Sequence, residues 1–552
     1  MPDYDLHSLN LPRLTGLGLK AFTAAVENPL SRALLLNSLL ENAGIPNLRR
    51  ILVEEAPTLY PLVAPAAWGP EVIPFEPGPQ PQEFPYHTCR DYAAAYRQGS
   101  LSPVTVAESL LAAIAASGQG DAPLRAFMPI NRADVLAQAK ASAGRFAAGR
   151  PLGPLDGVPV ALKDEVDMLP YPTTVGTAFM GQSPAAQDST VAARLRAAGA
   201  LMVGKTNMHE IGINPNGFNA HYGSVRNPFN SACDTGGSSS GSAAAVAAGL
   251  LPFAIGADGG GSIRIPAGLC GVVGLKATYG RVSEFGAAPL CWSVAHLGPL
   301  AASVEDAALA YAIIAGPDPC EPNSLLQPPV TLAGWNNPDL RGGRLGIYPQ
   351  WFEHASPEVV QVCKAMVEQL KAAGAEVLQV VIPGLDDMRV AHAVTILSEM
   401  AAAMHKYRAQ RSQMGAGVRL TLVVGEAATA TDYLQAQRVR TRAMAAFSQV
   451  FKQVDAILTP ATALAAQPIL PGGLSDGWSD LGTDTEMMRY VFPSNFTGNP
   501  AISFPAGYDS RGLPIGLQAI GRHWEEHLLL RLAYTAEQAM KRRQPERFYK
   551  VF

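Results

Sequence analysis

The sequence predicts an α/β fold, in which a β-sheet carries helices on both faces and a helical extension precedes it. From about residue 86 onward, short apolar runs typical of buried strands alternate with amphipathic segments of helical period. This alternation is typical of a sheet covered by helices on both sides. Before residue 64 the apolar residues have helical spacing, which predicts a small helical extension.

The chain divides into three parts by composition. Apolar residues recur at helical spacing from Leu17 to about Ala43, and Leu48–Leu62 predicts a second helix or two short ones. Prolines are then frequent over 64–85, which excludes a regular helix and predicts an extended linker. We therefore expect a helical extension over 1–63, a linker over 64–85 and a main domain over 86–552.

The elements of the main domain follow from the same patterns. Amphipathic spacing predicts helices, which are expected at 103–117, 131–148, 190–199, 241–250, 304–315, 357–374 and 525–540. A long helical region is expected over about 384–453, with a break near Gly415-Ala416-Gly417 because glycine disfavours helix. Short apolar runs predict strands at 157–162, 201–204, 251–257, 344–348, 376–381 and 455–459.

Composition excludes several classes of partner. A net charge of −4 and a pI near 6.2 give no electrostatic reason to expect a nucleic acid or an anionic membrane. No apolar run of about 20 residues predicts a membrane span, and the acidic N-terminus lacks a secretory signal. The six cysteines are scattered without metal-ligand spacing. We expect a cytoplasmic protein without a metal or cofactor.

Two glycine-rich loops contain the candidate chemistry. They are T-G-G-S-S-S-G at 235–241 and G-A-D-G-G-G-S-I-R-I-P-A at 256–267, on either side of a predicted helix and strand. Glycine lets the backbone approach a substrate closely, because it has no Cβ and tolerates positive φ. The first loop offers Ser238, Ser239 and Ser240, and the second offers Ser262. Simple turns do not account for two such loops at this spacing.

This stretch resembles the signature of the amidase signature family, G-G-S-S-(G/S)-G-S followed by G-x-D-x-G-G-S-I-R-x-P-A. The spacing of Ser238 and Ser262 fits that family, and so does Lys163 in the upstream motif G-V-P-V-A-L-K-D. The resemblance extends from about residue 86 to the C-terminus. It implies that 86–552 is one catalytic domain built on a large mixed sheet. It also implies a small-molecule amide as substrate and a homodimer.

Amide cleavage requires a nucleophile, a proton shuttle and stabilisation of an oxyanion. Ser262 is the expected nucleophile, and the oxyanion hole is expected from the N–H groups of Gly259, Gly260 and Gly261, with that of Ser262 itself. No histidine lies near either loop in the sequence. Lys163 is the expected base. It must be neutral, which requires burial, and an apolar strand precedes it.

The resemblance adds further roles. It implies that Ser238 relays the proton between Ser262 and Lys163 and lies at a cis peptide bond. Asp258 and Arg264 are expected to form a buried pair that holds the loop, and Ser239 to hydrogen-bond within the site. The family's variable pocket corresponds to four residues here, Gly212, Ile213, Asn214 and Trp292. An apolar or aromatic substrate portion would fit these residues, although Trp292 suits the core equally.

Other interpretations remain open. Gly237–Gly241 matches the G-x-S-x-G nucleophile elbow, which would make Ser239 the nucleophile and demand a downstream acid and histidine, but it leaves the second loop unexplained. A phosphate loop is disfavoured because no G-K-[ST] follows either glycine run. The predicted function is hydrolysis of a carboxylic amide through an acyl-enzyme on Ser262. Alternatives are ester or carbamate cleavage at the same site, the glutaminase subunit of a tRNA-dependent amidotransferase, and a non-catalytic scaffold.

Overall fold

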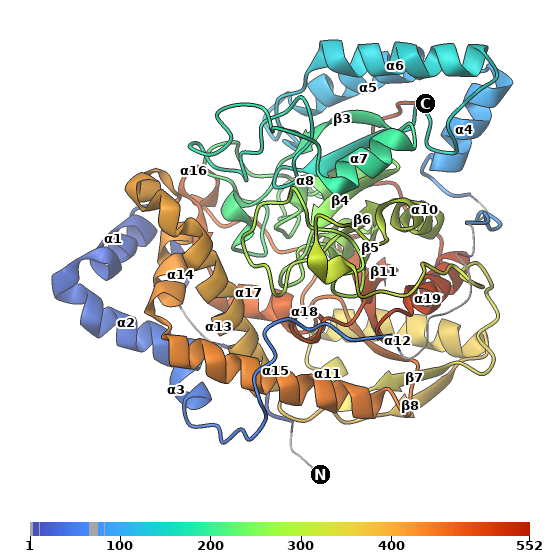
Figure 1. Ribbon diagram of the computed structural model, residues 1–552. Coiled ribbons are helices and arrows are strands. Elements are labelled where there is room, and N and C mark those ends of the chain that lie inside the picture. The colour runs from blue at the N-terminus through green and yellow to red at the C-terminus, as the bar shows by residue number, and fades with distance from the viewer. Residues whose placement is uncertain (1–3, 10–11, 66–74, 82) are drawn as a thin grey trace.

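The computed structural model describes residues 4–9, 12–65, 75–81 and 83–552, and a ten-stranded mixed sheet forms its centre (Figure 1). The strand order is β3-β2-β4-β6-β5-β11-β12-β9-β7-β8. The strands are β2 (Pro159–Lys163), β3 (Leu201–Thr206), β4 (Phe253–Ala257), β5 (Val273–Lys276), β6 (Leu297–Ala301), β7 (Arg344–Ile347), β8 (Glu376–Gln379), β9 (Ala456–Pro460), β11 (Ala501–Tyr508) and β12 (Pro514–Gly521). A separate two-stranded sheet pairs β1 (Leu14–Thr15) with β10 (Trp478–Ser479).

The sheet is parallel at its two ends and antiparallel in its middle. β2 pairs in parallel with β3 and β4, and β7 pairs in parallel with β8 and β9. Between them, β6, β5, β11 and β12 pair antiparallel with their neighbours. All six predicted strands are confirmed. The four antiparallel strands of the middle were not predicted. Each contains glycine, as in V-G-L-K and L-G-P-L-A, but so do the predicted β3, β4 and β7, so glycine content alone does not separate the two groups.

Helices cover both faces of the sheet. The helices of the main domain are α4 (Cys89–Gln98), α5 (Pro103–Ser117), α6 (Arg132–Ala147), α7 (Thr190–Ala197), α8 (Ser240–Ala247), α9 (Arg264–Cys270), α10 (Val304–Ile314), α11 (Pro349–Phe352), α12 (Pro357–Ala372), α13 (Leu385–Met404), α14 (Ala416–Ala427), α15 (Ala430–Val450), α16 (Gly473–Asp476), α17 (Leu481–Met488), α18 (Phe492–Thr497) and α19 (Glu526–Ala539). α8 and α9 pack on strands from β3 to β12, while α10, α12 and α19 form a second group on the sheet. The predicted α/β class, mixed sheet and break before α14 are confirmed.

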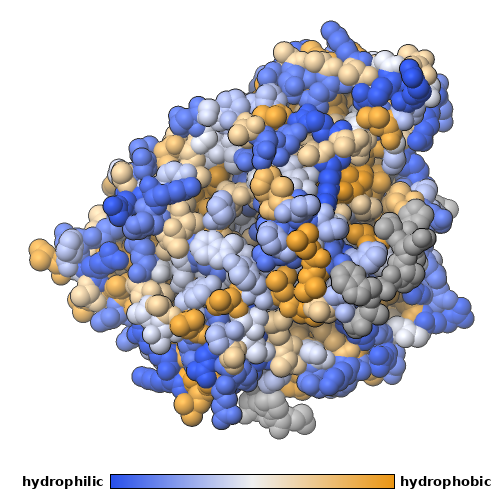
Figure 2. Space-filling model, in the orientation of Figure 1, coloured by the Kyte–Doolittle hydropathy of each residue, from blue (hydrophilic) through white to orange (hydrophobic). Residues whose placement is uncertain are grey.

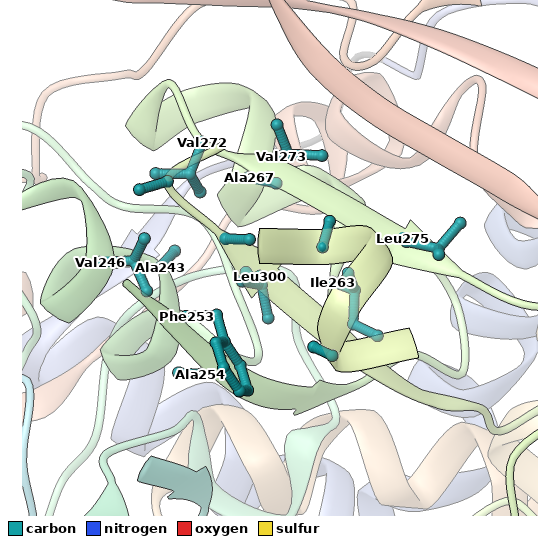
Figure 3. Packing of buried hydrophobic residues seen from close by; sticks show 14 of the residues in the cluster. Ala243, Val246, Phe253, Ala254, Ile263, Ala267, Val272, Val273, Leu275 and Leu300 are labelled. Atoms are coloured by element: carbon teal, nitrogen blue, oxygen red, sulfur yellow. The ribbon is translucent and has the colours of Figure 1, made fainter. Parts of the chain in front are cut away.

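Small residues allow α8 to lie directly against the sheet. Every residue of its sequence S-G-S-A-A-A-V-A is buried. A Cβ at Gly241 would lie only 2.3 Å from the carbonyl oxygen of Ala126, so no larger residue fits there. Figure 3 shows Ala243 and Val246 of α8 beside Phe253 and Leu300 of the strands. This close packing places the loop before α8 next to the ends of β2 and β4.

The N-terminal extension is helical only in its first part. α1 (Gly16–Glu27) and α2 (Pro29–Ala43) lie where helix was predicted, and a short α3 (Ile45–Leu48) follows. The predicted helix over Leu48–Leu62 is wrong, because this segment runs without helix along α15. Side chains of α15 donate to its carbonyl groups, including Arg438 to Glu55 at 2.8 Å and Arg440 to Leu59 at 2.6 Å. These tertiary hydrogen bonds replace the helical ones.

The described parts of the proline-rich stretch contain no helix or strand and lie on the main domain. Phe75 stacks on Trp335 with ring centroids 5.7 Å apart, and Tyr534 donates to the carbonyl oxygen of Pro79 at 2.9 Å. Residues 66–74 and 82 of the predicted linker lie outside the described residues. The division at 63 and 85 stays a prediction. Among the helices of the described residues, none is long and apolar enough to cross a membrane.

Candidate active site

Three segments meet at one edge of the sheet. β2 and β4 are adjacent parallel strands, so their carboxyl ends lie at the same edge. Lys163 ends β2, and residues 258–262 follow β4 directly. The loop before α8 reaches this edge because α8 packs on the same strands. This arrangement brings Lys163 and Ser262, which are 99 positions apart in the sequence, to one edge of the sheet.

Lys163 and Ser238 are in direct contact. Lys163 Nζ donates to Ser238 Oγ at 2.8 Å and also approaches the carbonyl oxygen of Ala257 at 3.3 Å. Both side chains are buried, with 1% exposure each. The peptide bond between Gly237 and Ser238 is cis, as the resemblance implied. Lys163 is therefore not a surface lysine, and its amine is directed at the first serine loop.

Ser239 connects the two loops. Its backbone N–H donates to the carbonyl oxygen of Ser262 at 3.2 Å. The Ser239 hydroxyl donates to the carbonyl oxygen of Ala257 at 3.1 Å and accepts from the backbone N–H of Ala257 at 3.2 Å. The Ser239 side chain is fully buried, whereas Ser262 is partly exposed. A buried hydroxyl that is bonded on both sides is a poor nucleophile, so this geometry disfavours the elbow interpretation.

The second loop is held by the Asp258 carboxylate. Asp258 accepts from the backbone N–H of Gly261 at 2.6 Å and pairs with Arg264 Nε at 3.0 Å. Burial opposes ionisation of Asp258, but the Arg264 guanidinium outweighs it and holds the pKa of that carboxyl well below its usual range. The Gly261 N–H is thus engaged within the loop. Hydrogen bonds of the described residues leave the N–H groups of Gly259 and Gly260 unengaged.

Arg264 ties this loop to the C-terminal part of the sheet. Its guanidinium donates to Ser494 Oγ at 2.7 Å, to Asn495 Oδ1 at 2.6 Å and to Gln518 Oε1 at 2.7 Å. The whole side chain is buried. With its acceptors on α18 and β12, the arginine anchors the loop on two further elements. The two side chains are paired and buried, and their role in holding the loop stays a prediction.

Glu165 is a site residue that the sequence prediction missed. Its Oε2 lies 3.0 Å from Lys163 Nζ, and the side chain is only 10% exposed. Asp164, the direct neighbour of Lys163 in sequence, instead pairs with the buried Lys205 at 3.3 Å. Asp164 and Glu165 lie in a turn that a hydrogen bond of 3.0 Å from the Val166 N–H to the Lys163 carbonyl oxygen closes, and this turn directs the two carboxylates to different lysines. The signal available in the sequence was the second acid in K-D-E.

A cavity adjoins the Gly259–Gly260 peptide. Its volume is 170 Å³, and its walls come mainly from α13, α17 and the segment after Gly212. The walls include Ile213, Asn214, His392, Ile396, Leu397, Met488 and Phe492. A Cβ at Gly260 would lie 2.9 Å from Met488 Cε and 3.1 Å from His392 Cε1, so cavity and loop are in contact.

The expected pocket residues are only partly brought together. Ile213 and Asn214 line the cavity. A Cβ at Gly212 would lie 3.1 Å from Ser238 Oγ, so its missing side chain lets the backbone approach the serine. Trp292 is not among the cavity walls, and its carbonyl oxygen accepts from Tyr279 at 2.6 Å. His392 and the other residues from α13 and α17 carried no signal in the sequence. In the described part of the chain, no cluster of three or more potential metal ligands is present.

The chain is similar to known proteins over most of its length. Residues 108–530 match the family model described as Amidase. A fatty acid amide hydrolase of Medicago truncatula is 39% identical over 99% of this chain and 96% of its own length. A glutamyl-tRNA(Gln) amidotransferase subunit of a Cyanothece species is 38% identical over 75% of this chain and 91% of its own. The peptide amidase of Stenotrophomonas maltophilia superposes with a TM-score of 0.71 at 30% identity, covering 84% of this chain and 99% of that one.

Proposed function

Because this chain belongs to the amidase family and hydrolyses amide C–N bonds, we propose that Ser262 is its nucleophile, with Ser238 and Lys163 as the proton relay. The hydrogen bond of 2.8 Å between Lys163 Nζ and Ser238 Oγ is the observation that carries the proposal. A serine hydroxyl both donates and accepts, so Ser238 can pass a proton on without holding charge.

In the first half-reaction, Ser262 Oγ bonds to the substrate carbonyl carbon. Its proton passes to Ser238, whose own proton passes to Lys163, and the carbonyl oxygen becomes an oxyanion. The free N–H groups of Gly259 and Gly260, together with that of Ser262, are the proposed donors to this oxyanion. The C–N bond then breaks, and the proton returns along the same route to the leaving nitrogen. Water cleaves the acyl-enzyme by the same steps and releases the acid.

The surroundings of Lys163 suit a base that cycles between two charge states. Lys163 can accept a proton only in the form of its neutral amine. The Glu165 carboxylate at 3.0 Å stabilises the ammonium that forms during the attack. This division of labour is comparable to that of the aspartate in a Ser-His-Asp triad, which stabilises the transient imidazolium.

The substrate we propose is a fatty acid amide. The cavity beside the oxyanion loop is lined by apolar side chains such as Ile396, Leu397, Met488 and Phe492, which suit an aliphatic acyl chain. The name of the Medicago relative, which matches over nearly the whole chain, supports the same class. Esters of the same acids fit the same steps, since an acyl-serine forms from any acyl donor whose leaving group departs. The amidotransferase subunit is similar over a smaller share of this chain, and we retain glutaminase activity as the second candidate.

Homodimerisation and a cytoplasmic location stay proposals. Several leucines of α1 and α2 are solvent-exposed, among them Leu17 at 84%, Leu30 at 96% and Leu34 at 81%. Apolar side chains are visible at the tip formed by these helices, at the left of Figure 2. Such a surface would suit a second copy. The mass of the protein in solution, compared with that of a Leu30→Glu, Leu34→Glu variant, tests the dimer, and cell fractionation tests the location.

The experiment that tests the proposed function measures acid release from fatty amides, short amides, aryl anilides, glutamine and fatty esters. Ser262→Ala is expected to abolish release from the preferred substrate. Ser240→Ala is the matched control, because the Ser240 hydroxyl is buried without a hydrogen-bond partner among the described residues. Turnover that survived Ser262→Ala would contradict the nucleophile. A preference for glutamine would favour the second candidate.

A further inference from the structure

His392 of α13 makes a direct hydrogen bond to the oxyanion loop, although no motif of the sequence includes it. Its Nε2 lies 2.9 Å from the carbonyl oxygen of Gly259, and the side chain is buried. The rings of Phe492 and Phe496 pack against the imidazole, each with its centroid 6.2 Å away. The ring is therefore held in one orientation by apolar contacts and is aimed at the loop.

The protonation state of His392 follows from its partner. A carbonyl oxygen only accepts, so Nε2 carries the proton and donates it to Gly259. Burial lowers the pKa of His392 to about 4, although the hydrogen bond to Gly259 opposes the shift. At neutral pH the ring is uncharged, with a single donor directed at the loop. It thus holds the loop without placing a second positive charge beside Arg264.

The direction of a peptide carbonyl determines that of the following N–H. A peptide group is planar, and in the trans form its C=O and N–H point to opposite sides. The Gly259–Gly260 bond is not among the cis peptide bonds. Because the Gly259 carbonyl points to α13, the Gly260 N–H points away from α13. Asn495 holds the Asp258–Gly259 peptide in the same way, since its Nδ2 donates to the carbonyl oxygen of Asp258 at 2.9 Å.

The loop needs a hydrogen bond from another element to fix its conformation, because it consists of glycines. Gly259, Gly260 and Gly261 have more backbone freedom than any other residue type. The Asp258 carboxylate engages the N–H of Gly261 at 2.6 Å but contributes no hydrogen bond to the Gly259–Gly260 peptide. Among the described residues, His392 is the side chain that bonds this peptide. Its removal would let the peptide rotate and would turn the Gly260 N–H out of place.

We propose that His392 is a positioning residue for amide hydrolysis, which holds the Gly259–Gly260 peptide so that the Gly260 N–H faces the oxyanion. This inference rests on the proposed function, in which Ser262 is the nucleophile. His392 acts through the loop and not by proton transfer. It also forms part of the cavity wall, so a substrate in the cavity lies beside the residue that orients the oxyanion donor.

The test compares two ketones that carry the same acyl chain. In a trifluoromethyl ketone, Ser262 Oγ bonds to the carbonyl carbon, the serine proton passes to Ser238 and Lys163, and the oxygen becomes a stable oxyanion. The methyl ketone occupies the cavity with little of this addition. The ratio of the two inhibition constants therefore measures oxyanion stabilisation apart from cavity binding. The proteins compared are the unmodified chain, His392→Leu, His392→Gln, and Thr421→Val as a control in the cavity wall.

His392→Leu is expected to reduce the preference for the trifluoromethyl ketone and to lower kcat, both by about 10- to 100-fold, because one oxyanion donor is worth about 100-fold or more. KM is expected to change little. His392→Gln retains an N–H donor and is expected to recover most of the loss. Thr421→Val is expected to change both inhibition constants by the same factor, so that their ratio stays the same.

The inference is overturned if His392→Leu retains the full preference, or if it weakens both ketones equally, as a purely structural role in the cavity wall would. A different result identifies failure of the proposed function. If the unmodified chain shows no preference for the trifluoromethyl ketone, or if Ser262→Ala retains that preference, Ser262 is not the nucleophile. The inference then falls with it.

Discussion

Lys163 Nζ and Ser238 Oγ are 2.8 Å apart in the interior of the protein, although 75 residues separate them in the chain. The contact exists because β2 ends where the loop before α8 begins to turn into the helix, and both pack on β4. It provides the proposed path by which the Ser262 proton leaves the nucleophile.

Replacement of Lys163 by methionine retains most of the length of the side chain but removes the base. General-base catalysis contributes about 10²- to 10⁴-fold, so kcat is expected to fall by that order. The measurement is acid release under saturating substrate, with near-ultraviolet circular dichroism to check that the variant is folded. A folded variant that retained kcat within tenfold would contradict the proposed relay.

Glu165→Gln is expected to lower kcat by about tenfold or more with little effect on KM. A hydrogen bond to a charged group is worth about 1.5–3 kcal/mol, and here it forms fully only when Lys163 is protonated. Steady-state kinetics separate the two parameters, and Glu165→Asp is the conservative variant expected to retain part of the activity. An unchanged kcat in Glu165→Gln, or a change confined to KM, would argue against a role during turnover.

Arg264→Leu is expected to lower the free energy of unfolding by about 3–5 kcal/mol, because it leaves Asp258 as an uncompensated buried charge. Both side chains are fully buried in the present structure. Urea denaturation measures the loss, and the double variant Asp258→Asn, Arg264→Leu is expected to be more stable than the single one. Equal stability of the single and double variants would show that the pair is not the source of the effect.

Acid is expected to destabilise the fold through buried histidines between about pH 6.5 and pH 4. Burial lowers the pKa of His523 to about 4. As pH falls below 6.5, the unfolded chain therefore binds a proton before the folded one, and stability decreases until the folded pKa is reached. His209 and His392 have similarly lowered pKa values, each of about 4.

The variant His523→Gln isolates one of these histidines and retains a donor toward the carbonyl oxygen of Thr497. In the window from pH 6.5 to pH 4, the difference in unfolding free energy between the unmodified chain and the variant is expected to change by up to about 1.4 kcal/mol per pH unit. Subtraction cancels the opposite contribution of Asp306, whose pKa burial raises to about 7. A difference that stayed constant with pH would contradict the buried, neutral His523.

Deletion of residues 1–63 is expected to destabilise the protein strongly. Leu19 and Val26 of α1 are buried against Leu420 and Val423 of α14. Each buried leucine or valine side chain contributes about 1.5–3 kcal/mol. Thermal unfolding and binding of an apolar dye measure the effect. A truncated chain as stable as the full one would show that the contacts between α1 and α14 contribute little to stability.

Much of the candidate site was readable from short stretches of sequence. Lys163, Ser238 and Ser262 each lie in a short local motif. The two serines stand next to glycines because backbone groups must approach a reacting carbonyl closely there. Glu165 was within reach of the same reasoning, two residues after the lysine. His392 was not, because 133 residues separate it from Gly259 and the helix that contains it has no glycine-rich signature.

The sequence by itself therefore determined the α/β class, six of the strands and the residues that could do chemistry. These properties depend on local periodicity and on which backbone conformations a residue allows. Only the tertiary structure decided that Leu48–Leu62 is not helical, that four further segments form the antiparallel middle of the sheet, and that α13 and α17 enclose the cavity. Each of these depends on hydrogen bonds and apolar contacts between distant segments. Such contacts override local preference because the packed chain satisfies its backbone groups and buries its apolar surface as a whole.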